Sequence, residues 1–125
     1  MKVTVEAQEP GRAGAELLAI ALTTLGSAAR LPARVAAVDR ALGGQIHDVV
    51  KSGDFRGRKG ETLVLFGRGR GAPRRVLLAG VGDAEKLDVE GLRQFAGRAV
   101  AAANARRVRS LAIAVPTSKR VRTSD

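Results

Sequence analysis

Short, uninterrupted apolar runs constrain the fold of this chain more than any other feature of its sequence. Four runs have the length of a β-strand and are predicted to be strands, of which 17–22 and 111–115 are expected to be buried within a sheet. The four runs are LLAIAL (17–22), TLVLF (62–66), RVLLAGV (75–81) and LAIAV (111–115). The N-terminal segment KVTVEA (2–7) alternates apolar and polar residues instead, which predicts a half-exposed strand at the edge of the sheet.

The segment between the second and third predicted strands has helical spacing. Its apolar residues recur at intervals of three or four from Val35 to Val50, which forms one stripe along a helix. Gly43 and Gly44 interrupt this stripe, so two short helices or one broken helix are expected. Gly53 follows at the position of a C-terminal glycine cap.

A second helix is predicted before the last strand. Asp88 is a suitable N-cap, and Arg106 and Arg107 suit the C-terminal end of the helix dipole. The apolar stripe of this helix is expected to pack on the sheet, and it consists of Leu92, Phe95, Ala96, Ala99, Val100 and Ala103.

The order of these elements predicts an α/β fold: a three-layer α/β/α sandwich around a mixed sheet of five to six strands. The short, glycine-rich connection GRGRGAP predicts an antiparallel hairpin between 62–66 and 75–81. Helical crossovers can join parallel strands, so 17–22 and 62–66 are expected to run parallel, as are 75–81 and 111–115.

Composition excludes several classes of protein. The chain has no cysteine, which rules out disulfides and thiolate metal sites and favours a cytoplasmic location. Aromatic residues make up 2% of the sequence, so the core must consist mainly of aliphatic side chains. Glu6 and Glu9 lie where a signal peptide would need an apolar run, and no segment has the length of a membrane span.

The net charge of +10 lies entirely in the second half of the chain. Such asymmetry can indicate a polyanionic partner such as DNA, but an arginine-rich composition that comes from codon bias, without any function, is the preferred explanation. The sequence has no recognition motif and few aromatics for base stacking, so any nucleic-acid binding is expected to be independent of sequence. The candidate surface consists of Arg56, Arg58, Lys59, Arg68, Arg70, Arg74 and Arg75, together with the arginine cluster at 106–109.

The stretch GDFRGRKGET (53–62) raises the question of a phosphate site. A phosphate-binding P-loop has the pattern G-x-x-x-x-G-K-[ST] between a strand and a helix. Here Lys59 precedes Gly60, and the predicted order is helix, loop, strand, so no helix N-terminus points at the loop. The glycines are better explained as turn residues that adopt positive φ.

Other chemistry finds no support in the sequence. His47 is the only histidine, it follows Ile46 on the helical pattern, and it is predicted to lie on the surface. Asp83, Glu85, Asp88 and Glu90 form an acidic cluster at the start of a helix, where carboxylates are favoured by the dipole, and a metal site there is the minor alternative. The residues by themselves predict a basic α/β domain without catalytic, metal or cofactor-binding residues.

Three segments of the chain resemble the leucyl (cytosol) aminopeptidase family. They are VDRALGGQIHDVVKSGDFRGRKGE (38–61), RRVLLAGVGDAEKLDVEGLRQFAGRAV (74–100) and LAIAVP (111–116). They occur in the family's order and at fitting distances, and the resemblance extends over nearly the whole chain to Pro116. In this resemblance, the glycine-rich stretch at 53–62 corresponds to the family's helix-to-strand connector.

The resemblance implies a particular role. The matching region is the family's N-terminal, macrodomain-like domain, here 1–116, with 117–125 as a linker or tail. The family's enzymes are hexameric metallo-aminopeptidases, and they hold two divalent ions, zinc, manganese or magnesium, in a separate C-terminal catalytic domain. That domain is expected to be absent here, so the chain alone is expected to help assembly and not to catalyse a reaction.

Overall fold

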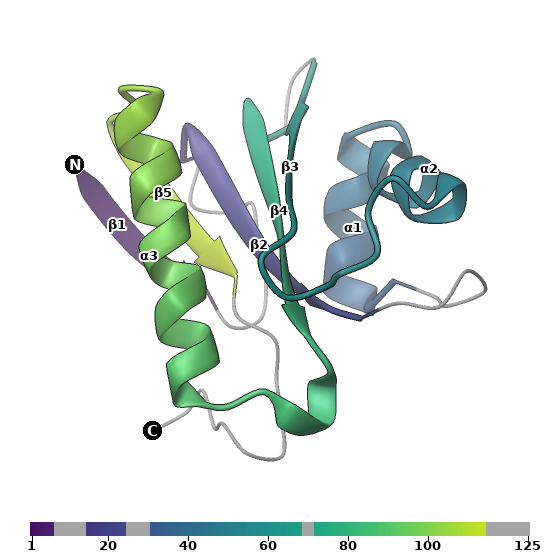
Figure 1. Cartoon of the computed structure of the whole chain (residues 1–125). Coiled ribbons are helices and arrows are strands. Elements are labelled where there is room, and N and C mark those ends of the chain that lie inside the picture. The colour runs from purple at the N-terminus through teal and green to yellow at the C-terminus, as the bar shows by residue number, and fades with distance from the viewer. Residues whose placement is uncertain (7–14, 25–30, 69–71, 115–125) are drawn as a thin grey trace.

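The computed structural model describes residues 1–6, 15–24, 31–68 and 72–114. They form one five-stranded sheet with α1 and α2 on one face and α3 on the other (Figure 1). The elements in chain order are β1 (Lys2–Glu6), β2 (Leu17–Thr23), α1 (Ala33–Ala41), α2 (Gln45–Ser52), β3 (Thr62–Phe66), β4 (Arg75–Gly82), a 3₁₀ turn η1 (Ala84–Lys86), α3 (Val89–Ala105) and β5 (Ser110–Ala114). The predicted three-layer α/β/α class is confirmed.

The strand order is β1-β5-β2-β4-β3, and every neighbouring pair is parallel except β3 with β4. The predicted hairpin and the predicted edge position of β1 are both confirmed. The expectation that 17–22 and 62–66 run parallel is wrong. The hairpin makes β3 antiparallel to β4, and β4 is parallel to β2, so β3 runs against β2 and lies one strand away from it.

Alternating side chains of the central strands build two separate cores. On one face, Leu18, Ile20 and Leu22 of β2 pack with the apolar stripe of α1 and α2. On the other face, Leu17 and Ala19 pack with α3. The predicted stripe of α3 is confirmed, because its buried members are Phe95, Ala99 and Ala103 and its half-buried members are Leu92, Ala96 and Val100.

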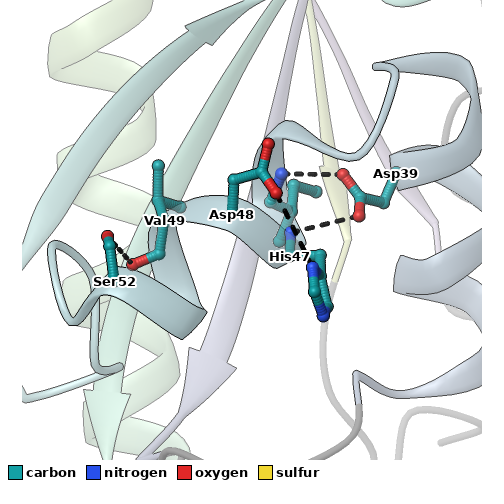
Figure 2. Close-up of polar contacts among 6 residues, drawn as sticks. Asp39, His47, Asp48, Val49 and Ser52 are labelled. Atoms are coloured by element: carbon teal, nitrogen blue, oxygen red, sulfur yellow. Dashed lines mark hydrogen bonds and ion pairs between the residues drawn. The ribbon is translucent and has the colours of Figure 1, made fainter.

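The break between α1 and α2 follows the two glycines, as predicted, and a buried carboxylate bridges it. Asp39 of α1 is 5% exposed, and its Oδ1 and Oδ2 accept hydrogen bonds from the backbone N–H groups of Ile46 (2.7 Å) and His47 (3.1 Å) (Figure 2). These N–H groups belong to the first turn of α2, where the helix itself provides no acceptor. Gly53 ends α2 with a φ of +86°, so the predicted glycine cap is also confirmed.

No helix among the described residues is long and apolar enough to cross a membrane. The predicted tail 117–125 lies outside the described residues. The last predicted strand is observed as Ser110–Ala114, and the position of its predicted final residue, Val115, also lies outside them.

Candidate functional site

The carboxyl ends of β2 and β4 form the place where a fold of this type usually binds a ligand. These neighbouring parallel strands continue to opposite faces of the sheet: β2 leads to α1 on one face, and β4 leads to α3 on the other (Figure 1). Such a divergence leaves a crevice beyond the strand ends, which is the ligand site of many open α/β sheets. The glycine-rich stretch at 53–61 lies at this position.

Backbone hydrogen bonds hold this stretch against the end of β4. Gly82 N–H donates to the carbonyl of Gly57 (3.0 Å), Gly60 N–H donates to Gly80 (3.2 Å), and Gly80 N–H donates to Glu61 (2.7 Å). Gly57 has a φ of +79°, and a Cβ built on it would collide with the carbonyl oxygen of Thr23 at the end of β2. A Cβ on Gly80 would likewise collide with the carbonyl oxygen of Arg58. The chain therefore fills its own crevice with backbone.

The chain also provides the anion that this loop binds. Glu61 Oε1 accepts hydrogen bonds from the backbone N–H groups of Arg56 (2.8 Å) and Arg58 (3.2 Å). A phosphate-binding loop would direct such N–H groups at its ligand. Because an internal carboxylate takes them here, the arrangement agrees with the turn interpretation and not with a phosphate cradle.

The charged side chains around this loop have both signs. Arg56, Arg58 and Lys59 are exposed, and the guanidinium of Arg98 lies near Gly60. Asp83 and Asp88 lie on the same end of the sheet, in the segment that connects β4 to α3. The carboxyl end is thus a mixed-charge surface.

The other predicted cations lie at the opposite end of the sheet. Arg75 begins β4 and Gly82 ends it, and eight residues of strand separate the two ends by about 23 Å. Arg74 also lies at the amino end, because its carbonyl accepts the N–H of Gly67 (3.1 Å) at the end of the antiparallel strand β3. The structure therefore divides the predicted basic surface in two, and Arg70 lies outside the described residues.

The amino ends of the parallel strands gather a larger basic group. Arg109 precedes β5, and its carbonyl accepts the N–H of Lys2 at the start of β1 (2.9 Å). Glu16 contributes one carboxylate here, and its Oε2 accepts the N–H of Arg109 (3.3 Å). We call this group the amino-end cations, and its members are Lys2, Arg68, Arg74, Arg75, Arg106, Arg107 and Arg109.

The remaining candidate residues have local structural roles. His47 is exposed, as predicted, and its Nδ1 lies 3.7 Å from Asp48 Oδ1 (Figure 2). Asp83 Oδ1 accepts the N–H of Glu85 (3.0 Å). Asp88 Oδ1 accepts the N–H of Gly91 (2.8 Å), which confirms it as the N-cap of α3. Across the described ranges, no three His, Cys, Asp or Glu side chains are placed to hold a metal ion.

Two cations join these groups without any sign in the sequence. Lys2 reaches the amino-end group because β1 pairs with β5, and Arg98 reaches the loop because α3 crosses the sheet. The positions of Lys2 and Arg98 depend on contacts between segments far apart in the sequence, so no local pattern predicts them.

Arg34 on α1 is partly buried, and its burial lowers the pKa of the guanidinium from its ordinary value.

Comparison with known proteins gives a consistent set of similarities. Residues 20–124 match the model of the "Cytosol aminopeptidase family, N-terminal domain". A probable cytosol aminopeptidase of Acidobacterium capsulatum is 32% identical over 127 residues, which cover 95% of this chain and 25% of that protein. One from Nitrosococcus oceani is 40% identical over 68 residues, 54% of this chain and 14% of that protein.

A solved structure shows the same fold. A mutant of tomato leucine aminopeptidase superposes with a TM-score of 0.70 and 22% sequence identity, over 95% of this chain and 23% of that one. The chain therefore spans about a quarter or less of the length of these proteins.

Proposed function

Because this chain belongs to the cytosol aminopeptidase family, as its N-terminal domain, we propose that it is the non-catalytic accessory domain of a leucyl aminopeptidase. The parent enzyme would be a cytoplasmic metallo-exopeptidase that releases N-terminal amino acids. This domain would contact the catalytic domain of the same protein. It would also contribute to the assembly of a homo-oligomer, which we propose to be a hexamer.

The filled crevice is the observation that supports this proposal most directly. Loop 53–61 occupies the carboxyl ends of β2 and β4 with its own backbone and its own carboxylate. A domain that closes its usual ligand site in this way is suited to a structural role. The two divalent ions of the proposed enzyme do not fit the described residues, which offer no cluster of three ligands, so we assign them to the catalytic domain.

The first test is catalytic. Amide hydrolysis needs a metal-bound water or an activated nucleophile, and neither is expected from this chain. The purified chain should not hydrolyse leucine p-nitroanilide, with or without added Mn²⁺ or Zn²⁺. Turnover that follows the chain through every purification step would refute a non-catalytic role.

The second test addresses assembly. In the Acidobacterium capsulatum relative, the N-terminal quarter would be deleted in one variant and replaced by this chain in another. We expect the deletion to lose oligomeric mass and the replacement to recover it, as measured by light scattering after size exclusion. A deletion variant that assembles as well as the intact enzyme would contradict the proposed role.

The amino-end cations favour a second candidate function, sequence-independent binding of DNA. The topology collects them along one end of the sheet, whereas the sequence scatters them over more than 100 residues. Arginine and lysine side chains so arranged can contact phosphates without reading bases. A salt titration of DNA binding separates this function from an arginine-rich composition.

A further inference from the structure

One of the three phenylalanines lies on the surface, in a chain that has no tyrosine or tryptophan. Phe55 and Phe95 are buried, whereas Phe66, the last residue of β3, is 55% exposed. Its neighbour Leu65 packs in the core under α1 and α2, so Phe66 lies on the opposite face of the sheet, the face of α3. Because α3 packs mainly on β2, β4 and β5, it leaves this ring on the edge strand β3 uncovered.

Backbone hydrogen bonds fix the position of this ring. Gly67 N–H donates to the carbonyl of Arg74 (3.1 Å), which continues the hairpin just beyond Phe66. On the outer side, the carbonyl of Phe66 accepts a hydrogen bond from Gln45 Nε2 (2.9 Å), and the same Nε2 donates to the carbonyl of Leu42 (3.0 Å). An outward carbonyl that already has a donor is a poor partner for an added strand. The ring is therefore the group that this end of β3 offers to a ligand.

Cations border the ring. Arg75 is the register partner of Phe66 on β4, so the two side chains share a face, with their Cβ atoms about 5 Å apart. Arg68 follows the ring by two residues and is exposed. Arg106 and Arg107 lie at the C-terminal end of α3, which reaches the same end of the sheet (Figure 1). This surface thus places an aromatic face among positive charges.

We propose that this surface binds single-stranded DNA, with an unpaired base stacked on the ring of Phe66. Arg68, Arg74 and Arg75 hold the phosphates on either side of that base. Stacking on aromatic side chains and contacts between cations and phosphates are the two components of single-strand binding without sequence preference. A duplex keeps its bases in its own stack, so it can use the cations but not the ring. The inference rests on the second candidate function above and narrows it to unpaired strands.

Fluorescence anisotropy of a labelled oligothymidylate tests the proposal, with a strand of about 12 nucleotides in about 0.05 M salt. The chain should bind this strand more tightly than a duplex of the same length. Phe66→Ala should weaken binding of the strand by about tenfold, because the loss of one stacked base has about that effect. It should leave binding of an abasic strand unchanged, since that strand offers phosphates without bases.

Phe66→Trp reports the stacking directly, because the chain itself has no tryptophan or tyrosine to add to the emission. Oligothymidylate should quench this emission, and the abasic strand should not. Val89→Ala is the matched control. Val89 is an apolar side chain of similar exposure, 57%, at the start of α3 and so at the opposite end of the sheet. This variant should bind the strand as the unaltered chain does.

The outcomes distinguish this inference from the candidate function on which it rests. Equal binding of strand and duplex, without any effect of Phe66→Ala, would overturn the inference and leave sequence-independent DNA binding in place. No binding of either would overturn both. A loss of abasic-strand binding in Phe66→Ala as large as the loss for oligothymidylate would also overturn the inference, because the ring would then support the cations and not a base.

Discussion

At the scale of single residues, loop 53–61 packs backbone against backbone on the strand ends. Gly57 and Gly80 let loop 53–61 touch the ends of β2 and β4 at a distance that excludes a Cβ. Gly57 is also buried and has a positive φ, so a side chain there would be strained twice, once by its backbone conformation and once by collision. The close packing of this loop on the strand ends therefore depends on the absence of a Cβ at both positions.

Gly57→Ala should destabilise the fold by about 2–4 kcal/mol, from a left-handed alanine and the displaced carbonyl of Thr23. Gly97→Ala is the matched control, because Gly97 is exposed on α3 and a Cβ there meets nothing within 4 Å. It should stabilise the protein by roughly 0.5–1 kcal/mol through helix propensity. Urea unfolding of both variants measures these changes, and equal stability of the two would show that the loop is not held as described.

At the scale of elements, the turn between α1 and α2 depends on one carboxylate. Asp39 lies in α1 but satisfies the first turn of α2, so it fixes the angle between two helices that share an apolar stripe (Figure 2). The same residue is the buried charged side chain of the described core. Its removal leaves two N–H groups without their acceptor inside the protein.

Asp39→Ala should cost about 2–3 kcal/mol of unfolding free energy. Asp39→Asn keeps one acceptor oxygen at the same place and should cost less. Amide hydrogen exchange at Ile46 and His47 provides a local readout, because both amides should lose protection in the alanine variant. Unchanged protection there would mean that the carboxylate does not cap α2.

The helix α3 is held by its aromatic residue more than by its alanines. Phe95 is 1% exposed and packs among residues of β2, β4 and β5. Phe95→Ala should destabilise the protein by about 3–5 kcal/mol, whereas Phe66→Ala, at a side chain 55% exposed, should change stability by less than about 1 kcal/mol. Chemical denaturation compares the two, and a loss below about 1 kcal/mol for Phe95→Ala would contradict the packing of α3.

At the scale of the whole molecule, the topology separates charges that are close in the sequence. Arg58 and Arg68 are ten residues apart, but they lie at opposite ends of β4. The carboxyl end mixes cations with Glu61, Asp83 and Asp88, while the amino end holds seven cations with Glu16 among them. If duplex DNA binds, the amino end is the surface expected to contact it.

A salt titration of DNA binding separates the two ends. Each phosphate contact contributes a slope of about −0.9 in log K against log salt. Charge reversal of Arg68, Arg74 and Arg75 should lower both affinity and slope, by up to about three units of slope if all three contact phosphates. The matched control reverses Arg56, Arg58 and Lys59. Equal losses in the two variants would leave only net charge as the explanation.

The sequence by itself determined the features that depend on neighbouring residues. Hydrophobic periodicity predicts the strands and the buried stripe of α3. Local start and stop signals predict the break at Gly43 and Gly44 and the cap at Asp88. The short connection between β3 and β4 also determined their antiparallel pairing, because two strands joined by so few residues can only turn back.

Only the tertiary structure decided how distant segments meet. Nothing in the order of the chain shows that β4 lies between β2 and β3, because strand position depends on which helices cover which face and not on sequence distance. That position brings Gly80 and Gly82 to loop 53–61, and it sends Arg74 and Arg75 to the other end of the sheet. The roles of Asp39 and Glu61 were hidden for the same reason. A carboxylate in a sequence carries no sign of the N–H groups that folding will bring to it.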